Sequence, residues 1–200
     1  MMMRKSLPAF LLASAVALGG TGTALAGDPG RLPDLPACVL GQAYDGACLL
    51  PLKDGQFTDG SLSSWRRVGL PGHGVDPDGM TYAALPTGSG ISQAVYAHTG
   101  QNTADAVYAV RFRVRAEHDQ AQVRATLSMS TDQGAGRVVL GHITSTAQAE
   151  EWSTVALSVQ GRPYAAPAHV LLEIENEGGA HTTVQVDDVA LVQNTDVDVL

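Results

Sequence analysis

Tyr108-Ala109-Val110-Arg111-Phe112-Arg113-Val114-Arg115 is the most regular stretch of the sequence. Every second side chain, starting with Tyr108, is apolar, and arginine fills three of the positions between them. Successive side chains of a β-strand point to opposite faces of its sheet. The pattern therefore predicts a half-buried strand, with an apolar face in the core and an arginine face in solvent.

Shorter strand signals surround this stretch. Residues 122–129 alternate in the same way, and further candidates are residues 137–143, 152–159, 170–175, 80–85 and 90–96. Trp152 or its neighbours are expected to reach the core. Glycine-rich turns at 134–136 and 176–179 separate the candidates. No segment has the apolar spacing of a helix, and no internal repeat is visible. The predicted fold is all-β, a two-sheet antiparallel β-sandwich of about eight strands.

The two ends of this region are expected to meet. Val184-Gln185-Val186-Asp187-Asp188-Val189-Ala190-Leu191 is an apolar strand interrupted by two carboxylates, and Asp54-Gly55-Gln56-Phe57 opens the region ahead of Trp65. If the first and last strands join here, one sandwich domain spans residues 53–194. Residues 195–200 then form a C-terminal tail.

The N-terminus has the pattern of an export signal. Arg4 and Lys5 precede an apolar run from Leu7 to Leu18, and Ala24-Leu25-Ala26 fits the small-residue rule for cleavage. Residues 1–26 are therefore expected to be removed, which places the protein in the periplasm or outside the cell. The apolar run is shorter than the roughly 20 residues that cross a bilayer, and no later segment is apolar enough to span one.

Residues 27–52 are predicted to form an N-terminal linker. This segment is rich in proline at its start and contains both cysteines of the chain, Cys38 and Cys48. In an oxidising compartment the two thiols are expected to form a disulfide, which would stabilise the fold by roughly 3 kcal/mol in the chain-entropy model.

Several motifs, in this order, resemble carbohydrate-binding modules of families four, nine and twenty-two. They are Asp54-Gly55-Gln56-Phe57, Asp59-Gly60, Trp65, Tyr108-x-Val110-x-Phe112-x-Val114, Trp152-Ser153-Thr154-Val155 and Val186-Asp187-Asp188-Val189-x-Leu191. The resemblance covers about residues 53–193. It implies a galactose-binding-like jelly roll, in which eight antiparallel strands form two packed sheets. A likeness of this kind specifies fold better than ligand.

The resemblance also implies a structural calcium ion that joins the first and last strands. Asp187 or Asp188 would be a ligand, and Asp78 lies where a loop would contribute another. Thr58 stands where the family usually has a glutamate, so one carboxylate is missing. Calcium takes six to eight oxygen ligands, many of them backbone carbonyls. The alternative is that the two aspartates accept backbone N–H bonds at a bulge in the strand.

A glycan would be expected on the polar face of one sheet. In jelly-roll order, the strand from Tyr108 would lie between the strands at 122–129 and 171–177, which brings arginines beside glutamates. The predicted ligand residues are Arg111, Arg113, Arg124 and Glu173, with Tyr82 or Tyr96 for stacking. The alternative is a solvated ladder of cross-strand ion pairs.

Composition and motifs narrow the function further. The chain carries 12 basic and 20 acidic residues, a formal net charge of −8, which disfavours nucleic acid and anionic membranes as partners. The six histidines are scattered, and no nucleophile motif is present, so the protein is predicted not to be an enzyme. The leading hypothesis is an exported glycan-binding module. The alternative is a structural or protein-interaction sandwich of the cell envelope. The oligomeric state is left open.

Overall fold

A computed structural model describes residues 35–39, 46–97, 106–131, 136–161, 168–178 and 181–194. The predicted export signal at 1–26 and the tail at 195–200 lie outside the described residues. The described residues form strands and contain no helix with the length and hydropathy of a membrane span. The predicted all-β sandwich is confirmed.

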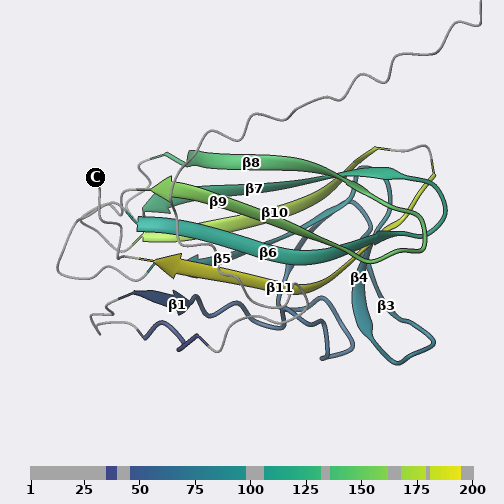
Figure 1. The fold of residues 1–200 in the computed structure, drawn as a ribbon, viewed down its shortest axis with the longest axis horizontal. Coiled ribbons are helices and arrows are strands. Elements are labelled where there is room, and N and C mark those ends of the chain that lie inside the picture. The colour runs from purple at the N-terminus through teal and green to yellow at the C-terminus, as the bar shows by residue number, and fades with distance from the viewer. Residues whose placement is uncertain are drawn as a thin grey trace, which may run out of the picture. The chain divides into compact units, whose positions relative to one another are not determined.

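The strands form two antiparallel sheets, shown in Figure 1. Sheet A has the order β3-β4-β11-β6-β9, with β1 pairing with β11, and sheet B has the order β2-β5-β10-β7-β8. The three short strands are β1 (Ala47–Leu49), β2 (Arg66–Val68) and β3 (Gly72–Val75). The longer strands are β4 (Thr81–Leu85), β5 (Gly90–Tyr96), β6 (Ala106–Ala116), β7 (Ala121–Thr131), β8 (Val138–Ala147), β9 (Ser153–Gly161), β10 (Ala168–Gly178) and β11 (Val184–Asn194).

The core lies between the sheets and follows the alternation of the sequence. In β6 every second residue from Ala106 to Ala116 is buried, and the residues between them, the arginines included, are only partly buried. Strand β10 alternates in the same way from Ala168 to Ile174. Both strands contribute their buried residues to one continuous hydrophobic cluster, as the two-sheet packing requires.

The predicted linker takes part in the sandwich. Cys48 of β1 lies opposite Gln193 of β11, and Leu50 donates its N–H to the carbonyl of Leu191 at 2.8 Å. Both Cys48 and Leu50 are buried. The predicted disulfide between Cys38 and Cys48 is present, with the two Cα atoms 5.0 Å apart.

The predicted order of strands is wrong. Strand β6 lies between β11 and β9 in sheet A, whereas β7 and β10 pair with each other in sheet B. The alternation within a strand shows which side chains face the core, but it carries no information about which strand lies next to it. The arginines of β6 therefore do not lie beside the glutamates of β10.

Candidate functional site

The outer face of sheet B is the first candidate site. It consists of the side chains of β5, β10, β7 and β8 that point away from the core, and we call it the sheet B face. Directly paired residues of antiparallel strands share a face, so the register assigns Ser92, Ala94, Tyr96, His169, Leu171, Glu173, Glu175, Arg124, Thr126 and Ser128 to it.

An aromatic pair with one exposed member, Tyr96, lies at one end of this face. Tyr96 and His169 are direct cross-strand partners, and their ring centroids lie 4.2 Å apart with an interplanar angle of 38°. The side chain of Tyr96 remains 44% exposed. A tyrosine ring offers a flat apolar surface with a polar hydroxyl at its tip. The pair can therefore pack against a flat ligand that is apolar on its faces and polar at its rim.

A clamped arginine lies farther along the same face. Arg137, just before β8, makes paired hydrogen bonds from its two terminal nitrogens to the carboxylate of Glu173, one of them 3.0 Å long. Its Nε donates to the hydroxyl of Ser128 at 2.7 Å. Bidentate pairing of this kind fixes both side chains in direction. Arg137 and Glu173 thus offer a ligand hydrogen-bonding groups that are already oriented.

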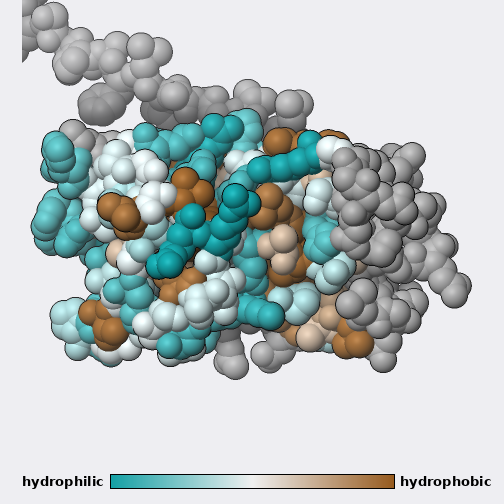
Figure 2. Space-filling view, turned by 180° about the vertical axis from the view of Figure 1, so that it is seen from behind, coloured by the Kyte–Doolittle hydropathy of each residue, from teal (hydrophilic) through white to brown (hydrophobic). Residues whose placement is uncertain are grey.

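A second ion pair extends the polar region. Arg124 lies 3.0 Å from the carboxylate of Glu177. Both side chains are about one-third exposed, so the pair adds little to stability and stays available to a ligand. Figure 2 looks onto this side of the molecule, and hydrophilic residues form an oblique band across it between smaller hydrophobic patches.

The two carboxylates of β11 form the second candidate site. Asp187 lies opposite Arg113, but Ala190 lies opposite Arg111, so β11 contains one extra residue at this point. Asp188 has φ +50, in the left-handed region. Together these features define a β-bulge. A bulge at these residues agrees with the alternative interpretation of the sequence, and the backbone hydrogen bonds that it assigned to both carboxylates stay a prediction.

Burial dominates the electrostatics of Asp187. Its side chain is only 6% exposed, and this desolvation raises the pKa of Asp187 to about 6. The hydrogen bond from Asp188 and the charge of Arg113 lower the pKa, whereas the charges of Asp188 and Asp76 raise it further.

Two arginines of β6 surround the bulge. Arg113 lies 3.6 Å from Asp188, and Arg115 lies 3.9 Å from Asp76. Trp152 lies beneath both guanidinium groups, whose central carbons are 4.9 Å and 4.7 Å from its ring centroid. Trp152 or its neighbours were expected to reach the core. Val155 does so, whereas Trp152 is only partly buried and its ring covers the two arginines on the outer face of sheet A.

The four predicted calcium ligands lie at the bulge of β11 and in two turns. Asp78 is exposed, and its N–H donates to Asp76. The hydroxyl of Thr58 lies 3.3 Å from the carboxylate of Asp54. In the described part of the chain, no three side chains of His, Cys, Asp or Glu are grouped to hold a metal. Calcium binding at these residues therefore stays a prediction, and it would have to draw most of its oxygen ligands from backbone carbonyls.

The carbonyls beside this bulge are also engaged. The carbonyl of Phe57 is 2.9 Å from Nε2 of His73, and the carbonyl of Gln56 accepts the hydroxyl of Thr81 at 2.7 Å. Calcium sites draw many of their oxygens from backbone carbonyls. Side chains of β3 and β4 thus contact two carbonyls of the loop after Asp54.

The six predicted glycan ligands fall on two surfaces. Arg124, Glu173 and Tyr96 lie on the sheet B face, whereas Arg111 and Arg113 lie on the outer face of sheet A. Tyr82, in β4 of sheet A, packs its ring over Gly74 of the neighbouring strand. The six residues therefore do not form one surface.

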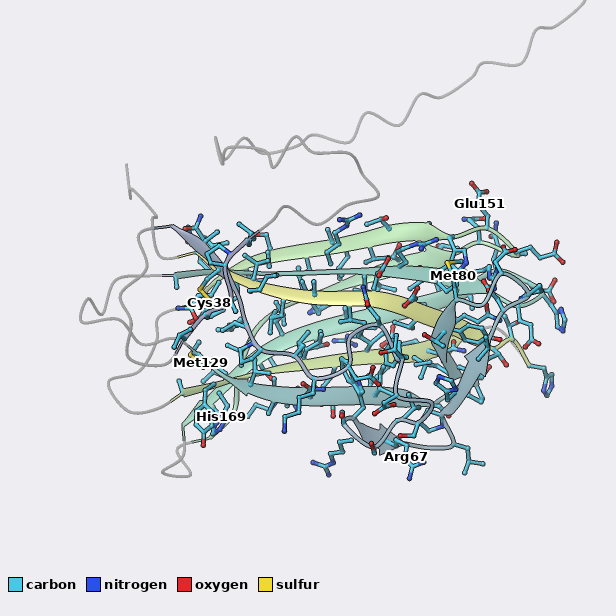
Figure 3. The ribbon with its side chains drawn as sticks, turned by 90° about the horizontal axis from the view of Figure 1, so that it is seen from below. Cys38, Arg67, Met80, Met129, Glu151 and His169 are labelled. Carbon is cyan, nitrogen blue, oxygen red and sulfur yellow. A yellow bond between two sulfur atoms is a disulfide. The ribbon has the colours of Figure 1, made fainter. Side chains whose placement is uncertain are left out.

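Two residues of the sheet B face were missed from the sequence. His169 matters because its register places it beside Tyr96, and Arg137 matters because it reaches Glu173 across β7. Neither contact has a local signal in the sequence, since both depend on strand order. In Figure 3, His169 lies toward the end of the molecule that contains Cys38, and Met80, beside Arg113, lies toward the other end. The two candidate sites are thus separate.

Solved structures with similar folds were compared with the chain. A family 61 carbohydrate-binding module in complex with β-1,4-galactotriose has 20% identity and a TM-score of 0.50, over 71% of this chain and 97% of that chain. A family 22 xylan-binding domain from Paenibacillus barcinonensis has 16% identity and a TM-score of 0.53, over 78% and 99%. A cyclase from Fischerella sp. TAU has 15% identity and a TM-score of 0.56, over 74% and 98%.

These likenesses concern the fold. No family model and no curated protein matches the sequence. The similar structures include binding modules and a cyclase, so one fold serves different activities among them. The jelly-roll fold implied by the resemblance in the sequence is confirmed.

Proposed function

We propose that the protein binds a glycan on the sheet B face and catalyses no reaction. The observation that carries this proposal is the exposed ring of Tyr96, which is 44% exposed and packed beside His169. A pyranose ring has C–H groups on its faces and hydroxyl groups around its rim. An aromatic ring with oriented hydrogen-bonding groups nearby is chemically matched to such a ligand.

Polar side chains of the sheet B face supply the hydrogen bonds that the hydroxyl groups of a glycan require. A guanidinium and a carboxylate that are paired with each other still have N–H groups and lone pairs left over, and these can hydrogen-bond to single sugar hydroxyls. Arg137 and Glu173 are already held in place by each other and by Ser128, so less side-chain entropy is lost on binding. The likeness to a galactotriose-binding module and to a xylan-binding domain supports a glycan as the ligand class.

The proposed place of action is outside the cytoplasm. Disulfides persist mainly in oxidising compartments, and Cys38 is bonded to Cys48. The export signal predicted at residues 1–26 leads to the same compartment. The protein would then meet polysaccharides in the periplasm or in the medium.

Affinity electrophoresis and calorimetry against a panel of soluble polysaccharides test this function. Replacing Tyr96 by alanine should weaken binding about tenfold, which corresponds to about 1.4 kcal/mol. Tyr82→Ala is the matched control, because Tyr82 lies in sheet A, and its binding should equal that of the wild type.

Two results would contradict the proposal. If Tyr96→Ala binds as tightly as the wild type while Tyr82→Ala does not, the ligand lies on sheet A. If the folded wild type binds no polysaccharide of the panel, glycan binding is wrong, and the alternative of a protein-interaction sandwich takes its place.

A further inference from the structure

Two apolar side chains lie on the sheet B face between the aromatic pair and the clamped arginine. Along β10, the side chains of His169, Leu171 and Glu173 point to this face in succession, because alternate residues of a strand share a side. Leu171 is directly paired with Ala94 of β5. Leu171 is partly buried and Ala94 is exposed, so a ligand can contact both. We call these two residues the apolar floor.

Different groups border the apolar floor at its two ends. The rings of Tyr96 and His169 lie at one end, and the ion pair of Arg137 and Glu173 lies at the other. His169 and Glu173 are four positions apart on one strand, so their Cα atoms are separated by about 13 Å. A sugar ring that stacks on Tyr96 would have one edge over the floor, because the floor occupies the next outward positions of both strands.

The apolar floor cannot satisfy the edge of an unsubstituted sugar. This edge carries hydroxyl groups, and a hydroxyl covered by apolar side chains loses its hydrogen bonds to water. Leu171 and Ala94 have no side-chain donor or acceptor to replace them. Ser128, which is paired with Leu171 on its other side, is buried, and its hydroxyl accepts a hydrogen bond from Arg137. The floor therefore favours a ligand that carries an apolar group at this edge.

The ion pair beside the floor specifies the polar part of that group. Arg137 and Glu173 neutralise each other, so a charged substituent gains no net attraction there. Three of the five N–H groups of Arg137 donate to Ser128 and Glu173, which leaves two for an acceptor on a ligand. The group that fits is thus uncharged, with an apolar end for the floor and a hydrogen-bond acceptor for the arginine.

An acetyl group has these properties, since it joins a methyl group to a carbonyl oxygen. We propose that the sheet B face binds acetylated glycans, with the acetyl methyl group on Leu171 and Ala94 and the carbonyl oxygen at Arg137. Removing the methyl group from water on the floor would favour binding. This inference rests on the proposed glycan-binding function and names the class of glycan. The acetyl group can belong to an ester of a sugar hydroxyl or to an acetamido sugar.

Isothermal titration calorimetry with two matched pairs of glycans tests this class. One pair is acetylated xylan and the same xylan after alkali has removed its acetyl esters. The other pair is the β-1,4-linked tetramer of N-acetylglucosamine and the β-1,4-linked tetramer of glucose. The wild type should bind the acetylated member at least tenfold more tightly in one pair or in both. A preference in the first pair identifies acetyl esters, and a preference in the second identifies acetamido groups.

Replacements of Leu171 test whether the floor causes the preference. Leu171→Asn should weaken binding of the acetylated member at least tenfold and bring the two members within threefold of each other, because its side chain is polar. Leu171→Met should retain the preference, since its side chain is still apolar. Leu70→Asn is the matched control, because Leu70 is 85% exposed and lies between β2 and β3. Thermal unfolding of each variant checks that it folds.

The outcomes separate this inference from the proposed function. Tyr96→Ala should weaken both members of a bound pair by a similar factor, because stacking on its ring does not depend on the acetyl group. Equal binding of the two members of both pairs by the wild type would overturn the inference and leave glycan binding in place. It would also be overturned if Leu171→Asn kept the preference, or if Leu70→Asn lost it. A wild type that binds none of the four glycans would overturn it as well, and the polysaccharide panel then decides separately whether the protein binds any glycan.

Discussion

Asp187 is the residue whose environment departs most from that of an ordinary carboxylate. It lies at 6% exposure in the last strand, and burial raises its pKa to about 6. The charged groups around it are Arg113, Asp188 and Asp76, of which only the arginine favours ionisation. An ionised Asp187 is therefore a cost to the folded state.

This cost predicts how stability changes with pH. The pKa of Asp187 in the folded protein lies above its usual value, so between about pH 4 and pH 6 Asp187 binds more protons in the folded protein than in the unfolded chain. The contribution of Asp187 to stability therefore falls as pH rises through this range. The difference between 3.8 and about 6 corresponds to about 3 kcal/mol. In Asp187→Asn this loss should be absent, because the amide does not ionise.

Urea unfolding of the wild type and of Asp187→Asn from pH 4 to pH 7 measures the effect. The stability of the variant relative to that of the wild type should increase by up to about 3 kcal/mol as pH rises through this window. Other titrating groups are common to both proteins and cancel in the difference. A difference that stays constant with pH would contradict a raised pKa at Asp187.

At the scale of elements, the bulge in β11 is hydrogen-bonded to the loop that opens the domain. Val189 donates its N–H to the carbonyl of Gly55 at 2.9 Å, so the loop provides the hydrogen-bond acceptor for a backbone N–H inside the bulge. Trp65 donates its ring N–H to the carbonyl of Asp54, and its ring lies 5.6 Å from that of Phe57. The loop and the last strand are thus joined by backbone contacts and by buried aromatic rings.

Gly55 is required by this joint. A Cβ atom at Gly55 would lie 2.2 Å from the carbonyl oxygen of Val189. The backbone of Gly55 and that of Val189 are held together by their hydrogen bond, so neither can easily move away. Gly55→Ala should therefore lower the free energy of unfolding by at least about 2 kcal/mol. At Gly72, in β3, a Cβ would have no neighbour within 4 Å, so Gly72→Ala should change stability by less than about 0.5 kcal/mol.

Chemical unfolding of the two alanine variants distinguishes the effect of the contact between Gly55 and Val189 from a general effect of replacing glycine by alanine. Equal changes in both variants would mean that the approach of Gly55 to β11 contributes nothing to stability. A large loss in Gly55→Ala alone would identify the contact between loop and bulge as the closure of the fold.

At the scale of the molecule, the sequence predicts local features such as the buried side chains of a strand, but it does not predict the order of the strands in each sheet. The alternation from Tyr108 to Val114 correctly identified the buried side chains, and the two cysteines correctly identified the disulfide. The order of strands was wrong, because alternation is the same whatever strand lies beside it. The predicted glycan surface was divided between two sheets for the same reason.

The sheet B face shows the same limit in its residues. Tyr96 was predicted as a stacking residue, but its partner His169 is 73 positions away in the sequence and becomes its neighbour only through the register of β5 with β10. Trp152 or its neighbours were expected to reach the core; Val155 is buried there, whereas Trp152 is only partly buried. Its ring instead covers Arg113 and Arg115, an arrangement that depends on which two strands bring them together.

The disulfide acts on the stability of the whole domain from its periphery. It joins residue 38 to β1, and β1 adds three residues to the edge of β11, whereas most of the hydrophobic core comes from β4 to β11. The sandwich should therefore fold without the bond. With a sequence separation of 10, the chain-entropy model gives a loss of about 3 kcal/mol on removing it.

Guanidinium unfolding of the double variant Cys38→Ala/Cys48→Ala tests this expectation. The midpoint should fall while the transition stays cooperative with nearly the same denaturant dependence, because the surface exposed on unfolding hardly changes. Reducing agent should lower the midpoint of the wild type and leave that of the variant unchanged. If the variant instead loses cooperative unfolding, β1 and its disulfide are part of the core structure rather than an addition to its edge.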